Sequence, residues 1–279
     1  MPSGSAPEAP GTRHLSFDEY GGTAPENYQR YFVPQIAAPI AADLIDAARL
    51  RPGDRVLDVA CGTGIVARMA AERVGPDGSV AALDLNPGML EVARGAAAAL
   101  PIDWREGRAE LMPLPSGAFD VVLSQFSLQF FSDRSAAVGE MCRVLASGGR
   151  IVLNLPGPMP ALFGVLETAL GDHLPDHAAA FVRAVFSLHD DETLRQLLAA
   201  AGFQQIVASR ALKRLRLPSP IDFLWQYVWS TPLVNAASTL DPDQRRQLET
   251  DVLQRSMPFV HDGSLIVDLP VLTVAAQKP

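Results

Sequence analysis

The chain has 279 residues, is 48% hydrophobic and carries a formal net charge of −8, which allows a sizeable α/β core and disfavours nucleic acid as a partner. Two cysteines do not provide a disulfide framework, and no uninterrupted apolar stretch is long enough to span a bilayer. The N-terminal residues lack the basic start and apolar stretch of a signal peptide, so we expect a cytoplasmic protein with reduced thiols.

The N-terminal region divides into a polar tail and a helical segment. Residues 1–12 are rich in Pro, Gly, Ser and Ala, and we expect a disordered tail over residues 1–15. An aromatic segment at 28–33 is followed by Pro34. Beyond this proline, the apolar spacing predicts a helix over residues 36–49.

The next segment has the pattern of a strand, a glycine turn and a helix. Residues 56–59 form an apolar run that is interrupted only by Asp58, as in a strand buried within a parallel sheet. Gly62 and Gly64 permit a tight turn that a ligand can approach, because neither has a Cβ. Residues 65–74 then have the apolar face of a helix. The pattern predicts a nucleoside-binding βαβ unit.

Two interpretations of this unit remain. The spacing from Gly62 to Ala67 also fits an NAD(P)-dependent oxidoreductase, with Asp84 about 20 residues on, where an acid holds the ribose. However, the charge of Asp58 before the turn would repel a diphosphate and attract a ligand that carries an ammonium and a sulfonium. No Tyr precedes a Lys at the spacing of the short-chain reductase dyad. The residues therefore favour a cationic nucleoside, with the oxidoreductase as the alternative.

The rest of the chain predicts a sheet with helices on both faces and a helical cap. Strands and helices alternate to about residue 155, which predicts an α/β fold with a Rossmann-like doubly wound sheet, mainly parallel with a closing antiparallel strand. Strands are expected at 55–60, 79–84, 102–106, 119–124, 149–154, 204–217 and 264–276. Helices are expected at 88–99, 134–146, 161–186, 191–201, 220–230 and 241–256.

The expected division of the chain follows from this alternation. We assign N-terminal helices and a nucleoside-binding core to residues 16–155. Residues 156–190 and 218–262 form helical cap insertions over the substrate site, and 191–217 and 263–279 complete the sheet.

Four segments in this order resemble one known family. They are residues 58–64 at the glycine turn, 83–90 after the second strand, 107–120 before the fourth strand and 143–150 before the fifth strand. The chain resembles the class I S-adenosylmethionine (SAM)-dependent methyltransferases, in particular the small-molecule group that includes the ubiquinone/menaquinone C-methyltransferases. The resemblance covers about residues 40–155 and implies SAM as the cofactor, without a metal.

The resemblance also implies a set of cofactor-binding residues. Asp84 would accept the ribose hydroxyls, and Arg108 stands where the family usually has an acid or amide that accepts the adenine amino hydrogen. Arg is only a donor, so the backbone of Ala109 or the carboxylate of Glu110 would replace that contact. The predicted set is Asp58, Ala60, Gly62, Gly64, Asp84, Leu85, Met89, Ala109, Glu110 and Ser124.

Substrate contacts are predicted from residues near the expected methyl group. Gln125 and Gln129 follow the fourth strand and could orient a substrate, whereas Tyr28 and Tyr31 could close over the sulfonium. Trp225 lies in the predicted cap and could line an apolar pocket. For the tyrosines, packing of the N-terminal helix is the alternative.

The sequence does not identify a catalytic base. The five histidines are His14, His173, His177, His189 and His261, and the expected shared helix face of His173 and His177 lacks the Glu of a metalloprotease motif. We predict methyl transfer to O, C or N of a small natural-product or quinone-like acceptor. A non-catalytic SAM-fold partner subunit is a further alternative, and a homodimer is left open.

Overall fold

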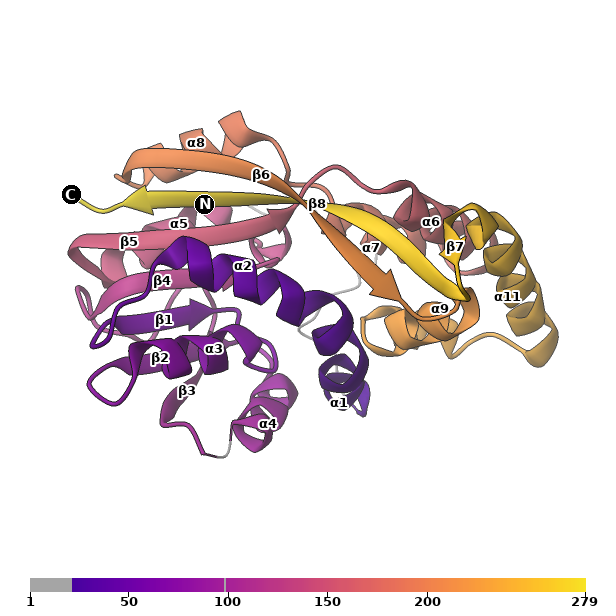
Figure 1. The fold of residues 1–279 in the computed structure, drawn as a ribbon, viewed down its shortest axis with the longest axis horizontal. Coiled ribbons are helices and arrows are strands. Elements are labelled where there is room, and N and C mark those ends of the chain that lie inside the picture. The colour runs from indigo at the N-terminus through magenta and orange to yellow at the C-terminus, as the bar shows by residue number, and fades with distance from the viewer. Residues whose placement is uncertain (1–21, 98) are drawn as a thin grey trace, which may run out of the picture.

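The computed structural model describes residues 22–97 and 99–279, and its frame is one mixed sheet with a helical cap at one end (Figure 1). The expected tail at 1–15 lies outside the described residues. The strand order is β3-β2-β1-β4-β5-β8-β6, with β7 paired to β8. The strands are β1 Arg55–Val59, β2 Ser79–Asp84, β3 Ile102–Glu106, β4 Phe119–Gln125, β5 Leu145–Pro156, β6 Gln204–Leu217, β7 Val260–His261 and β8 Ser264–Gln277.

The first five strands pair in parallel, in the order β3-β2-β1-β4-β5. β8 then pairs antiparallel with β5 on one side and with β6 on the other. Helices cover both faces, and their apolar sides form two buried clusters with the sheet. One cluster joins the sheet to α2 Ala38–Ala48 and α3 Ile65–Val74, and the other joins it to α5 Arg134–Val144 and α8 Asp191–Ala200. α4 Pro87–Ala96 packs beside β3. The predicted Rossmann-like fold is confirmed.

The N-terminal helical region is longer than predicted. α1 Ala24–Asn27 continues directly into a π-helix, η2 Tyr28–Ala37, and then into α2. Pro34 lies inside the π-helix, so the helix begins before residue 36, where the sequence predicted its start. In an α-helix the proline ring clashes with the carbonyl four residues earlier, and the wider turn of a π-helix changes the position of that carbonyl relative to the ring. The aromatic residues at 28–33 therefore lie on a helix that contacts both α4 and the cap.

The cap consists of five helices around the outer halves of β6 and β8. These two strands pair from Gln204 with Gln277 to Leu217 with Leu265, and they extend beyond the parallel strands toward the cap (Figure 1). A third buried cluster, rich in aromatic residues, joins this ribbon to the cap helices. The helices are α6 Ala161–His173, α7 His177–Val185, α9 Pro220–Trp229, α10 Leu233–Ala237 and α11 Pro242–Ser256.

The two histidines at 173 and 177 do not share a helix face, because α6 ends at His173 and α7 begins at His177. His173 instead lies 3.3 Å from the carboxylate of Asp251 on α11. Two short 3-10 helices complete the described elements, η3 Leu128–Phe130 and η4 Met257–Phe259. No helix in the described ranges is sufficiently long and apolar to cross a membrane.

Candidate active site

The glycine turn after β1 is held by the acid at the end of β2. The Gly62 N–H donates to Asp84 Oδ2 at 2.7 Å, and the Asn86 N–H donates to Asp84 Oδ1 at 2.9 Å. Asn86, rather than Asp84, caps α4, since its side chain accepts from the N–H groups of Gly88 and Met89. Asp84 therefore does not serve as the helix cap and lies where β2 meets the turn, as a ribose-binding acid would.

The backbone conformation at Gly64 and the close approach of Trp104 both require a glycine at this position. Its φ is +79°, in the left-handed region that side chains rarely adopt. A Cβ on Gly64 would lie 2.4 Å from Cη2 and 2.8 Å from Cζ3 of Trp104 on β3. We expected a larger side chain here to occupy cofactor space, but the structure shows that it would collide with Trp104.

Asp58 lies inside β1 and is 1% exposed. Burial and, to a lesser extent, the charge of nearby Asp84 raise the pKa of Asp58 to about 8, although a hydrogen bond from the Ala67 N–H in the first turn of α3 limits the rise. Asp58 is therefore protonated at neutral pH in this structure. The expectation that a charged Asp58 would repel a diphosphate is therefore wrong, because the neutral side chain carries no charge.

A cavity of about 480 Å³ opens at the carboxyl ends of the parallel strands and extends under the cap. Its lining includes seven of the predicted cofactor residues: Ala60, Gly62, Asp84, Leu85, Met89, Ala109 and Glu110. Three of the predicted substrate residues, Tyr28, Gln125 and Gln129, also line it. The other predicted residues lie behind the lining or elsewhere: Asp58, Gly64, Ser124, Tyr31 and Trp225.

Ser124 and Trp225 have internal partners. The Ser124 hydroxyl donates to the Val59 carbonyl at 2.8 Å and contacts the Ser127 hydroxyl, so it ties β4 to β1. Trp225 donates its indole N–H to Glu249 at 2.7 Å and packs under the Arg245 guanidinium. Trp225 does not line the cavity as predicted, but Tyr227 on the same helix, α9, does.

The cap end of the cavity is lined by aromatic rings that sequence analysis did not identify. We define the aromatic chamber as this part, with Phe130, Phe163, Phe181, Phe186 and Tyr227. Phe130 stacks with Phe181 at a centroid distance of 6.1 Å, and Phe163 lies 5.1 Å from Phe186. The sequence places these residues on four separate elements, and only the tertiary packing of the cap brings them together.

The segment after β4 forms part of the cavity wall. Phe126 has a φ of +50°, a left-handed conformation that is strained for a bulky residue. Its N–H donates to the Asn154 carbonyl, and its own carbonyl accepts from Gln129 Nε2, both at 3.0 Å. Gln125 Nε2 donates to the Ala37 carbonyl at 3.0 Å and so attaches the N-terminal helices to β4. The cavity wall here is fixed by backbone contacts.

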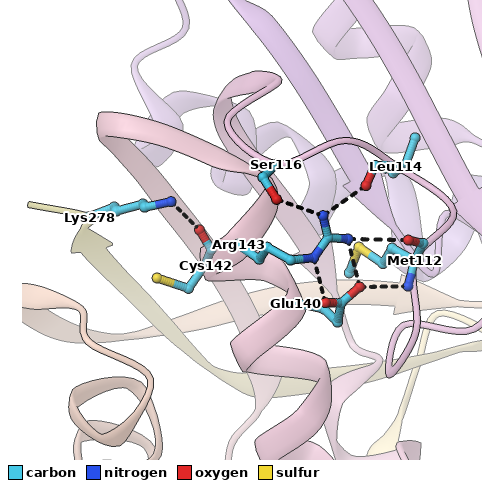
Figure 2. Close-up of polar contacts among 7 residues, drawn as sticks. All are labelled: Met112, Leu114, Ser116, Glu140, Cys142, Arg143 and Lys278. Carbon is cyan, nitrogen blue, oxygen red and sulfur yellow. Dashed lines mark hydrogen bonds and ion pairs between the residues drawn. The ribbon is translucent and has the colours of Figure 1, made fainter.

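The loop that carries Arg108, Ala109 and Glu110 is anchored to α5 through Arg143. Figure 2 shows the Arg143 guanidinium donating to the Leu114 and Met112 carbonyls at 2.9 and 3.2 Å, and ion-paired with Glu140. Glu140 also accepts from the Met112 N–H at 2.8 Å. The hydrogen bonds from Arg143 lower the pKa of Glu140, so the carboxylate stays ionised. This network holds the loop against the cavity.

One oxygen of the Glu110 carboxylate is held by Ser132. Burial raises its pKa, but hydrogen bonds from the Ser132 hydroxyl and N–H outweigh this effect and hold the pKa below its usual range. Its second oxygen lies 3.8 Å from Arg108 Nε. Arg108 and Glu110 both line the cavity, so the pair presents a donor and an acceptor to a ligand there.

Tyr28 lies where the two ends of the cavity meet. Its ring stacks on Phe32 at 4.7 Å, and its edge approaches Gly62 in the turn. Burial, with the nearby Asp84 and Asp58, raises the pKa of its phenol, so the side chain is a neutral donor at physiological pH. No histidine among the described residues lines the cavity, and none of their His, Cys, Asp and Glu side chains form a metal-binding group.

The turn, the acid at the end of β2 and the cavity beside them define a nucleoside-binding α/β protein. Comparisons with known proteins specify the family. Residues 57–153 match the methyltransferase domain family. The chain is 30% identical to nocamycin O-methyltransferase of Saccharothrix syringae, over 86% of this chain and 90% of that protein. It is 36% identical to demethylmenaquinone methyltransferase of Thermus thermophilus, over 57% of this chain and 78% of that one.

The chain therefore belongs to the class I SAM-dependent methyltransferases and is an enzyme. Solved structures agree in fold. A phosphoethanolamine N-methyltransferase 2 from Haemonchus contortus, solved with SAM, aligns with a TM-score of 0.61 and 18% identity, over 95% of this chain and 59% of that one. The YcgJ protein of Bacillus subtilis aligns with a TM-score of 0.55 and 19% identity, over 85% and 97%.

Proposed function

We propose that this methyltransferase binds SAM at the sheet end of the cavity and methylates O, C or N of an apolar, ring-bearing small molecule held in the aromatic chamber. The observation that carries the proposal is the continuity of one cavity from Asp84 to Phe163 and Tyr227. Asp84 would accept the ribose hydroxyls, and the anchored loop at 107–110 would face the adenine. SAM supplies an activated methyl group, and the enclosing aromatic residues exclude water.

The lining favours an apolar acceptor over a charged one. No charged side chain among the described residues of the cap lines the cavity, so an ionic head group such as phosphoethanolamine would lose hydration without gaining a counter-charge. The names of the relatives point the same way, since one acts in nocamycin methylation and another methylates demethylmenaquinone. We infer an acceptor of this apolar class.

Calorimetry with S-adenosylhomocysteine (SAH) and with NAD tests the cofactor directly. We expect SAH to bind in one-to-one stoichiometry and NAD to give no heat at the same concentrations. Tight NAD binding, or no SAH binding by a folded protein, would contradict the proposal. A control with Asp103, an exposed acid on β3, replaced by Ala should bind SAH like the wild type, because this side chain pairs with the neighbouring Arg105 and is not part of the cavity lining.

A further inference from the structure

A single tyrosine places a polar atom in the aromatic chamber. Tyr227 lines the cavity, and the residue is only 4% exposed. Its ring lies between Phe163, at a centroid distance of 5.8 Å, and Phe223, at 5.7 Å. A tyrosine has only two side-chain torsions before its hydroxyl, so these contacts fix where the oxygen lies.

The Tyr227 hydroxyl has no hydrogen-bond partner within residues 22–97 and 99–279. It is not one of the unpaired polar atoms sealed inside the protein, so it is accessible from the cavity that the residue lines. Burial raises the pKa of this phenol, and the group therefore keeps its proton at neutral pH. An O–H group that is shielded from bulk water and lacks an acceptor costs free energy, and a hydrogen bond to a ligand oxygen would remove this cost.

Other polar groups of the cap do not compete for this role. The Thr231 hydroxyl also lines the cavity, but it donates to the backbone carbonyl of Tyr227 at 2.9 Å. The remaining lining residues from the described part of the cap are apolar: Pro156, Phe163, Phe181, Ala184, Val185 and Phe186. Tyr227 is thus the one uncommitted side-chain donor in this part of the described structure.

We propose that the Tyr227 hydroxyl donates a hydrogen bond to a carbonyl-type oxygen of the acceptor, which is an apolar ring compound in which that carbonyl is conjugated with the nucleophilic atom. This inference rests on the proposed function and specifies its substrate class. Conjugation with a carbonyl acidifies an enol or phenol, and the donor stabilises the charge that the anion shares with the carbonyl oxygen.

This acceptor class fits a cavity whose described lining offers no general base beyond the cofactor contacts. The two lining tyrosines have raised pKa values, and the carboxylates of Asp84 and Glu110 are held by hydrogen bonds. An acceptor that arrives ionised has no proton to lose. Its charge is delocalised rather than fixed on a head group, and the positive sulfonium of SAM would be its counter-charge. Its oxygen or carbon forms the new bond to the methyl group while the C–S bond breaks, and the electron pair remains on sulfur. Tyr227 is a positioning residue in this step.

The test uses 1-tetralone and tetralin, two bicyclic probes that differ in one carbonyl group. Each is titrated by calorimetry into the SAH-bound full chain of the wild type, Tyr227→Phe and Ser238→Ala. The Ser238 hydroxyl lies on the cap surface and donates to the Asn235 carbonyl, so its removal controls for loss of a cap hydroxyl elsewhere. We expect Tyr227→Phe to weaken 1-tetralone binding about fivefold to tenfold, the effect of one hydrogen bond, and to leave tetralin unchanged.

An infrared measurement on the wild type provides a second readout that needs no variant. The carbonyl band of bound 1-tetralone should lie at lower frequency than in an apolar solvent, because a hydrogen bond weakens the C=O bond. Equal loss of both probes in Tyr227→Phe, an unchanged carbonyl band, or no binding of 1-tetralone to SAH-bound protein would overturn the inference and leave the proposed function standing. A wild-type protein that binds no SAH would overturn both.

Discussion

Replacing Gly64 by alanine tests how the glycine turn depends on the neighbouring strand. The left-handed backbone of Gly64 costs an L residue about 1–2 kcal/mol. The new Cβ would also lie 2.4 Å from Trp104 Cη2, and such overpacking costs about 1–3 kcal/mol. The sum, about 2–5 kcal/mol, should lower the melting temperature by about 3–9 °C in a chain of this size.

Thermal melts monitored by circular dichroism measure this effect, and a second glycine provides the control. Gly95 lies in α4, and a Cβ there would meet nothing within 4 Å, so Gly95→Ala should maintain or raise the melting temperature. In a Trp104→Ala background, Gly64→Ala should lose its overpacking cost and keep only the backbone cost. If Gly64→Ala melts like the wild type, or costs the same in both backgrounds, the assigned contact is wrong.

The remaining predictions concern the carboxylates and the cap. Asp84→Ala should weaken SAH binding tenfold or more, about 1.4 kcal/mol or more, because it removes the acceptor of the Gly62 N–H together with the proposed ribose contact; unchanged affinity in a folded variant would refute this role. Asp58 has a folded-state pKa raised from 3.8 to about 8, so the folded state binds the extra proton and stability should fall as pH rises between these values. Asp58→Asn should flatten that slope in urea unfolding, and a slope equal to that of the wild type would exclude Asp58 as its source. Hydrogen exchange at 156–190 and 218–262 should slow when SAH and 1-tetralone are bound together while β1 stays protected, and equal exchange in the free and ternary states would mean that the cap is not a mobile cover.

Local sequence patterns correctly placed the glycine turn and Asp84 side by side at the sheet end of the cavity. The glycine turn and the acid that ends β2 are neighbours through a single βαβ unit, so their spacing along the chain already fixes their proximity in space. The positions of the strands and of the helices that cover the sheet followed from apolar periodicity, which is also a local property of the sequence. The strand at 204–217 was predicted with the bounds that the structure shows.

The sequence did not predict the aromatic chamber, because its residues come from helices that are far apart along the chain. Phe130, Phe163 and Tyr227 were not predicted as cavity residues, since no local pattern distinguishes a ring that lines a cavity from one that fills a core. The helix was predicted to start after Pro34 because proline disrupts the interior of an α-helix, whereas the structure accommodates Pro34 within a π-helix. The protonation of Asp58 depends on burial, which composition and spacing do not report.

The orientation of bound SAM tests the central claim most directly. Protein loaded with SAM that carries a ¹³C-labelled methyl group would be measured by isotope-filtered nuclear Overhauser spectroscopy. The account predicts cross-peaks between the SAM methyl protons and aromatic ring protons, because the sheet end of the cavity opens into the aromatic chamber. Bound SAM whose methyl protons show no cross-peak to any aromatic ring, or a folded protein that binds no SAM, would contradict it.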